Sequence, residues 1–145
     1  MKPLLALVFL LVLGNCAIAD ELGLVVSNAW VREGPPGVRM MAGYLEIENA
    51  TQSLRTLRGA SSLDFNAVEI HTTIIENGIA RMRHVPELAI APGQSVQLQP
   101  GAKHLMLMGP VKALKAGDRV EIELDFGENG ALSVQFPVRL AVSER

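Results

Sequence analysis

Imidazole and thioether side chains alternate with leucine in the segment His104-Leu105-Met106-Leu107-Met108. Successive side chains of a β-strand point to opposite faces, so a strand here would place His104, Met106 and Met108 on one face and the two leucines on the other. The leucines then belong to the core, and the second face carries groups that can bind a metal ion. Packing is the alternative interpretation, because flexible methionines commonly fill gaps beneath a second sheet or a covering loop.

A second set of such side chains flanks the dipeptide Asn77-Gly78. Asn-Gly is favoured in two-residue type I′ hairpin turns, and pairing across this turn sets His71 opposite His84. Thr73 then faces Met82, which makes Met82 a diagonal neighbour of His71 at roughly 7 to 8 Å or less. These side chains share one face of the predicted hairpin. They form either part of a metal site or an ordinary polar cross-strand pair on a solvated face.

Histidine and methionine without cysteine suit copper. Thioether sulfur is soft and selects Cu(I), and imidazole accepts copper in either oxidation state, whereas zinc sites rarely use methionine. The single cysteine, Cys16, lies in a segment that we expect to be removed or modified. A thioether cannot form a disulfide, so such a site would stay available in an oxidising compartment. The lack of a thiolate excludes a blue-copper electron-transfer centre.

Short strands must position these residues. From Leu22 onward apolar and polar residues alternate between turn sequences, which is typical of an all-β sandwich or barrel. The clearest hairpin joins two alternating runs across Gly127-Glu128-Asn129-Gly130. The expected strands cover residues 24–31, 43–48, 54–60, 68–75, 79–85, 95–98, 103–108, 119–126 and 132–138. The sequence therefore predicts one all-β domain of about nine strands.

The N-terminal segment resembles a cleaved signal peptide. Lys2 precedes an apolar run over residues 4–13, and Ala17-Ile18-Ala19 fits the small-residue rule for cleavage. The run is about half as long as the roughly 20 apolar residues of a membrane span, so we expect no stable membrane insertion. We expect removal of residues 1–19, secretion to the periplasm, and a single domain over residues 20–145.

Acylation of Cys16, as in lipoproteins, is the alternative to this processing. Asn15 argues against it, because a small residue such as Gly, Ala or Ser usually precedes the acylated cysteine. Either form leaves the mature chain without a free thiol.

Charge and composition exclude several classes of function. Loss of Lys2 with the leader would reduce the Lys and Arg residues from 13 to 12 against 15 Asp and Glu, a formal charge of about −3 without a basic run. Nucleic acid is therefore not an expected partner. No nucleophile is accompanied by a base and an orienting group, and Asp64 and Glu69 form no evident carboxylate pair, so we do not expect an enzyme.

The spacing of the candidate ligands matches a known pattern. Ten residues separate His71 from Met82, and twenty-one separate Met82 from His104-x-Met106. This resembles the signature of the PCu(A)C family of periplasmic copper chaperones, in which an optional methionine follows the first histidine and is replaced here by Thr72. The similarity extends over about residues 24–138. Its further elements are Ala29-Trp30-x-Arg32, Pro35-Pro36, Ala42-Gly43-Tyr44-Leu45, Asn49, Pro100-Gly101 and residues 104–109.

The resemblance implies a cupredoxin-like Greek-key β-sandwich or barrel with an exposed site for one Cu(I) per chain. The ligands would be His71, Met82, His104 and Met106. Copper would then pass to a copper-accepting protein, either cytochrome c oxidase subunit II during assembly of its CuA centre or another assembly chaperone. The alternatives are a periplasmic copper buffer or resistance protein without a dedicated recipient, and a metal-free β-sandwich used for adhesion or protein binding.

Other residues near the signature are expected to have structural roles. His84 and Met108 lie outside the signature and are expected to pack around the site, although a second or oxidised copper could use them. The residues expected in the core or in loop packing are Trp30, Tyr44, Met40 and Met41.

Overall fold

The computed structural model describes residues 18–19 and 22–140, most of which lie in strands and turns. A short 3-10 helix, η1, covers Gly127–Asn129. The strands of the described residues are β1 (Ile18–Ala19), β2 (Leu24–Arg32), β3 (Met40–Asn49), β4 (Arg55–Leu57), β5 (Gly59–Ser61), β6 (Phe65–Glu76), β7 (Ile79–His84), β8 (Leu88–Ile90), β9 (Ser95–Leu98), β10 (Lys103–Pro110), β11 (Arg119–Asp125) and β12 (Ala131–Arg139).

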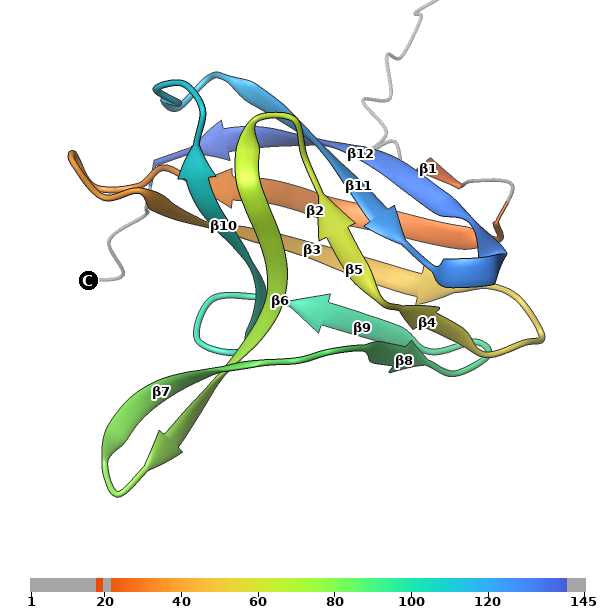
Figure 1. Ribbon diagram of the computed structural model, residues 1–145. Helices are drawn as coiled ribbons and strands as arrows, with labels where there is room; N and C mark the ends of the chain where they lie inside the picture. Colours follow the sequence, from red (N-terminus) through yellow and green to blue (C-terminus); the bar gives the residue numbers. More distant parts are fainter. Residues whose placement is uncertain (1–17, 20–21, 141–145) are drawn as a thin grey trace, which may run out of the picture.

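Seven strands close into a barrel in the order β2, β12, β11, β5, β6, β10 and β3, because β3 pairs with β2 as well as with β10 (Figure 1). Only β12 and β2 run parallel within this barrel; its other neighbouring strands are antiparallel. β9 extends the sheet beyond β3, while β4 and β8 form a separate two-stranded sheet. The predicted all-β, single-domain architecture is confirmed.

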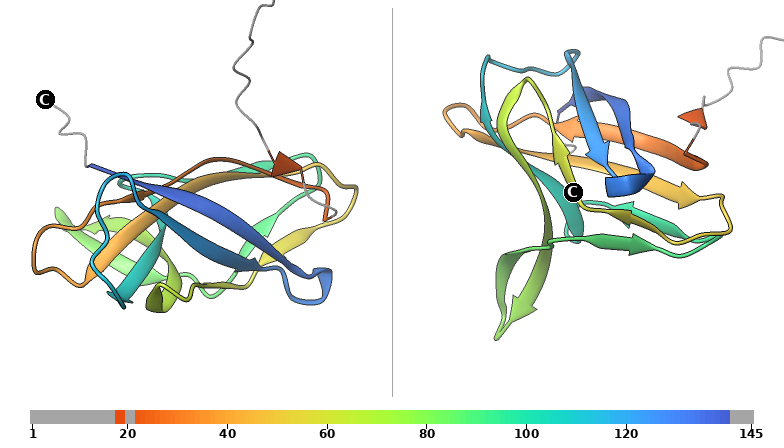
Figure 2. Two further views of the ribbon diagram at one scale, coloured as in Figure 1. Left: turned by 90° about the horizontal axis from the view of Figure 1, so that it is seen from above. Right: turned by 45° about the vertical axis from the view of Figure 1, so that its right-hand side comes forward.

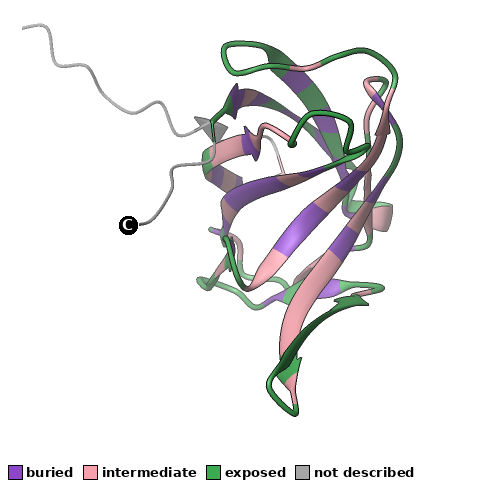
Figure 3. Cartoon of the chain, turned by 90° about the vertical axis from the view of Figure 1, so that its left-hand side faces the viewer, coloured by how far each residue is buried: buried purple, intermediate pink, exposed green. Residues whose placement is uncertain are grey.

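The barrel interior is filled by alternate residues of its strands. β10 lies between β6 and β3, and its Leu105 and Leu107 are fully buried, as the alternation predicts. Buried and less buried bands alternate along the strands in Figure 3. The inward residues of β11 and β12 are Val120, Ile122, Leu124, Leu132, Val134, Phe136 and Val138. Burial of these apolar rows is the main force that holds β6 and β10 side by side.

The β6–β7 hairpin extends beyond the barrel, as both Figure 1 and the right-hand view of Figure 2 show. The first part of β6, as far as Thr72, pairs with β10, whereas residues 71–76 pair with β7. All six residues of β7 are exposed, and Ile75 of β6 and Ile79 of β7, near the turn of the hairpin, are 76% and 58% exposed. The hairpin is therefore an arm that leaves the sheet next to His71.

The nine predicted strands are present, with one difference. The segment 54–60 divides into β4 and β5, because β4 pairs with β8 in the second sheet and β5 joins the barrel beside β11. Alternation alone could not separate these two strands, because they follow one another closely in a single short segment of the sequence. β8 is not among the predicted strands, because its three residues are too few to display a period.

Most of the predicted leader lies outside the described residues. Ile18 and Ala19 pair with Val26 and Val25 of β2, and removal of residues 1–19 stays a prediction. Within residues 18–19 and 22–140, no helix is long and apolar enough to span a membrane.

Candidate metal centre

Two histidines that are far apart in the sequence lie side by side in the barrel. His104 of β10 is the direct cross-strand partner of His71 of β6, and their ring centres are 6.1 Å apart. The same pairing sets Met106 opposite Glu69. An antiparallel pair puts directly opposed side chains on one face of the sheet. His71, His104, Met106 and Glu69 therefore share a face.

The fourth candidate ligand arrives on the β6–β7 hairpin. Asn77 and Gly78 have φ angles of 52° and 76°, as a type I′ turn requires at both central positions. The resulting register pairs Thr73 with Met82 and His71 with His84, as predicted. The local turn thus places Met82 on the face that carries His71.

A groove with a volume of about 470 Å³ lies over this face. Met82, His104 and Met106 line it, and His71 adjoins it as the neighbour of His104 on the next strand. The remaining walls come from the end of β2, the loop after it, β3, Thr73 and Gly101. Those lining residues are Arg32, Glu33, Gly34, Pro35, Met40, Met41, Ala42 and Tyr44, with Thr73 and Gly101. A metal ion held here would lie between the hairpin arm and the β2–β3 loop.

The His104 ring is buried and oriented by the backbone. Its Nδ1 lies 3.1 Å from the carbonyl oxygen of Ala102, and a carbonyl can only accept a hydrogen bond. Nδ1 therefore carries the proton and Nε2 keeps a lone pair available for a metal. His104 lies on the predicted face of β10, opposite the two leucines, but the residue is only 4% exposed. In the closed barrel β6 and β3 flank β10 on both sides, and the groove walls rise beside it.

The His71 ring is oriented by a carboxylate. Its Nε2 lies 2.8 Å from Oε2 of Glu69, and the side chain of His71 is 17% exposed. An ionised carboxylate only accepts, so Nε2 carries the proton, and in the neutral ring Nδ1 carries the lone pair. This Nδ1 is buried and has no hydrogen-bond partner. A buried acceptor without a partner is costly, and a metal ion would satisfy it.

The four candidate donors are soft or borderline ligands, and none of them is a carboxylate or a thiolate. Within the described residues, no three His, Cys, Asp or Glu side chains are arranged as a metal site, and the centre described here combines two imidazoles with two thioethers. Burial raises the pKa of the Tyr44 hydroxyl above its usual value, partly opposed by the nearby Arg32 charge. The tyrosine wall of the groove therefore stays protonated and neutral. These donors fit Cu(I) better than a hard divalent ion.

Comparison with known proteins assigns the family. A family model described as LpqE-like matches residues 24–138, which is most of the chain. The chain belongs to the LpqE-like, or PCuAC, family. Within it, the protein Lxx21020 of Leifsonia xyli subsp. xyli is 30% identical over 118 residues, which are 81% of this chain and 70% of that protein. The family resemblance read from the ligand spacing is thereby confirmed.

Solved PCuAC domains share the fold. The copper-bound PCuAC domain from PmoF2 superposes with a TM-score of 0.69 at 21% identity, over 81% of this chain and 93% of that domain. The solution structure of CuI-DR1885 from Deinococcus radiodurans gives a TM-score of 0.66 at 32% identity, over 81% of this chain and 78% of that one. The cupredoxin-like fold expected for this PCuAC protein is confirmed.

Several residues of this PCuAC protein lie elsewhere than the sequence suggested. Met41 packs in the core as expected, but Met40 is 51% exposed and lines the groove. Adjacent residues of a strand face opposite ways, so one packing role could not fit both. Tyr44 is buried, whereas Trp30 is only half-buried and packs against Tyr44 with the rings tilted and their centres 4.7 Å apart. Met108 of β10 lies opposite Met40 of β3 and does not line the groove.

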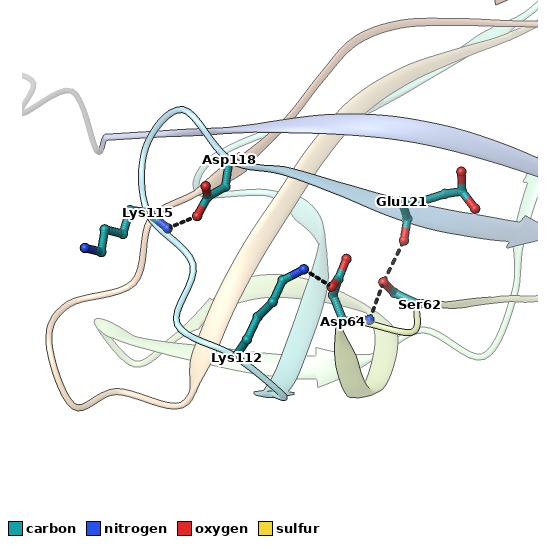
Figure 4. Close-up of polar contacts among 6 residues, drawn as sticks. All are labelled: Ser62, Asp64, Lys112, Lys115, Asp118 and Glu121. Atoms are coloured by element: carbon teal, nitrogen blue, oxygen red, sulfur yellow. Dashed lines mark hydrogen bonds and ion pairs between the residues drawn. The ribbon is translucent and has the colours of Figure 1, made fainter.

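Glu69 is the functional candidate that sequence reasoning missed. It precedes His71 by two residues, and residues i and i+2 of a strand are neighbours on one face. That spacing was the available signal. Asp64 serves a different contact, since its carboxylate lies 2.8 Å from the Lys112 ammonium (Figure 4). This hydrogen bond and the Asp64 charge raise the pKa of Lys112.

Proposed function

We propose that this protein binds one Cu(I) per chain and carries it to a partner protein. The ligands in this proposal are His71, Met82, His104 and Met106. The observation that carries it is the buried, unpartnered Nδ1 of His71 beside a His104 ring whose Nε2 is also free to bind. The similarity to CuI-DR1885, at 32% identity, supports copper as the cargo.

The exposure of the ligands suits a carrier. His104 is almost fully buried, whereas Met82 on the arm is 59% exposed. The histidines would hold the ion at the floor of the groove, and the thioethers would cover it from the arm and from β10. An incoming ligand from a partner can replace Met82 first, because that side chain is accessible and uncharged. Copper would then move by shared ligation without ever being free in solution.

A Cu(I) competition titration with a chromophoric chelator tests the binding site. The wild-type protein should bind one Cu(I), and His71→Ala and His104→Ala should each lose most of this affinity. Because His104 is buried, its variant also needs a thermal unfolding curve, while the partly exposed His71 provides the second test. Wild-type affinity in both folded variants would exclude this site.

We further propose that the protein works in the periplasm and delivers copper to cytochrome c oxidase subunit II, for the CuA centre, or to another assembly chaperone. A gene deletion assayed under copper limitation tests this role. Reduced oxidase activity that returns on copper supplementation is the expected result. Normal oxidase activity combined with sensitivity to excess copper would instead identify a copper buffer.

A further inference from the structure

Three imidazoles form a row across three neighbouring strands. His71 lies in the middle, with its ring centre 6.1 Å from that of His104 on β10 and 5.9 Å from that of His84 on β7. Exposure increases along the row, from the buried His104 through the partly buried His71 to the exposed His84. The row therefore leads from the floor of the proposed copper site to the solvent side of the arm.

We propose that His84 is a third imidazole ligand for copper, which together with His71 holds the ion at the rim of the site during uptake and release. Two imidazoles bound to one ion by bonds of about 2 Å have ring centres roughly 4.5 to 6.3 Å apart, depending on the angle between the bonds. Both distances in the row lie in this range. His84 and His104 lie on opposite sides of β6. An ion bound to His71 therefore takes one of them at a time as its second imidazole ligand.

His71 is the ligand that both positions share. Glu69 accepts a hydrogen bond from its Nε2, so Nδ1 is the ring nitrogen left to bind copper, and only the second imidazole is exchanged. In the exchange, the bond from copper to His84 breaks as the bonds to His104 and Met106 form. The exchange replaces one imidazole nitrogen by another on the same Cu(I) ion, so copper keeps its oxidation state. This step rests on the proposed function and adds a route to its site.

The arm gives His84 the freedom that this role needs. All of β7 is exposed, and exposed side chains change rotamer within nanoseconds. The arginines of the strand do not compete for the site, because Arg81 and Arg83 alternate with Met82 and His84 and pair with Glu76 on the other face. The site face of β7 thus offers one thioether and one imidazole to an ion at the rim.

The test compares the rate of Cu(I) transfer with the equilibrium affinity. Cu(I)-loaded wild-type protein, His84→Ala and His84→Met are mixed with excess chromophoric chelator in a stopped-flow instrument. His84→Ala should release copper about tenfold more slowly while its equilibrium affinity changes by less than about threefold, because the lost bond exists only at the rim. His84→Met restores a Cu(I) donor and should recover most of the rate. Arg81→Ala, on the opposite face of β7, is the matched control.

The outcomes separate this inference from the proposed function. Equal rates for His84→Ala, Arg81→Ala and wild type would overturn the role of His84 and leave the Cu(I) carrier intact. A loss of equilibrium affinity in His84→Ala as large as that in His104→Ala would also overturn it, by making His84 a permanent ligand. Absence of Cu(I) binding by the wild-type protein would reject the proposed function itself.

Discussion

Oε2 of Glu69 lies 2.8 Å from Nε2 of His71, two residues further along the same face of β6. The contact turns the other ring nitrogen of His71 into a buried acceptor without a protein partner. Metal-binding histidines commonly have such a carboxylate or carbonyl partner, which selects the tautomer and orients the ring. In this protein a carboxylate serves His71 and a backbone carbonyl serves His104.

The contact predicts a role for Glu69 in copper affinity. Glu69→Ala should weaken Cu(I) binding by about 10- to 100-fold, the usual cost of losing such a partner. Glu69→Gln keeps an oxygen that accepts from Nε2 and should retain most of the affinity. Competition titrations measure both, with Glu123→Ala on the exposed face of β11 as the control. If Glu69→Ala and Glu123→Ala bind equally well, Glu69 does not orient the site.

The two methionines of β10 should differ in their effect on copper. Met106 lines the groove, whereas Met108, on the same face of β10 and opposite Met40 of β3, does not. Leucine preserves most of the volume of methionine but has no sulfur donor. Met106→Leu should therefore weaken Cu(I) binding by about tenfold or more, and Met108→Leu should have little effect. Equal losses in the titration would show that Met108 also contributes to the site.

The turn at Gly78 should affect the Cu(I) affinity of the protein as well as its stability. Gly78 and Gly93 both have positive φ angles, 76° and 69°, and neither would meet a neighbour on gaining a Cβ. Alanine at either position should cost about 1 kcal/mol or somewhat more through backbone strain alone. Only Gly78→Ala distorts the turn that places Met82, so only this variant should also lose Cu(I) affinity. Chemical denaturation and copper titration of both variants decide the matter.

The core residues beneath the site should contribute strongly to the stability of the folded protein. Leu105 is fully buried between β3 and β6, next in sequence to His104. Leu105→Ala should lower the free energy of unfolding by about 2 to 5 kcal/mol, through lost burial and a residual cavity. Leu63→Ala is the control, because Leu63 is 99% exposed and its change should stay within about 0.5 kcal/mol. Thermal or urea unfolding measures the difference.

The raised pKa of Tyr44 predicts how the free energy of unfolding changes at high pH. Burial raises the pKa of its hydroxyl above the usual value of 10.0. The unfolded chain therefore loses this proton before the folded protein does, and the contribution to stability present below pH 10 falls as the pH rises further. Tyr44→Phe removes this effect. The unfolding free energy of wild type should fall more steeply above pH 10 than that of the variant, and parallel curves would contradict the assignment.

Much of the local geometry followed from local patterns. The Asn77-Gly78 turn allows few backbone conformations, so the register of β6 and β7 could be derived without the rest of the protein. Alternation likewise identified the inward leucines of β10. The burial of His104 could not be derived this way, because it depends on strands that flank β10 on both sides and on a loop from the other end of the chain.

The sequence by itself determined the strands, the turn and the inventory of donors, because each depends on residues that are near one another along the chain. Only the tertiary structure decided that His104 lies opposite His71, that Met40 borders the groove, and that three imidazoles form a row. The partner of a strand in a closed barrel is selected by the burial of the whole core. That collective choice brings β10 beside β6 and so assembles the candidate metal centre.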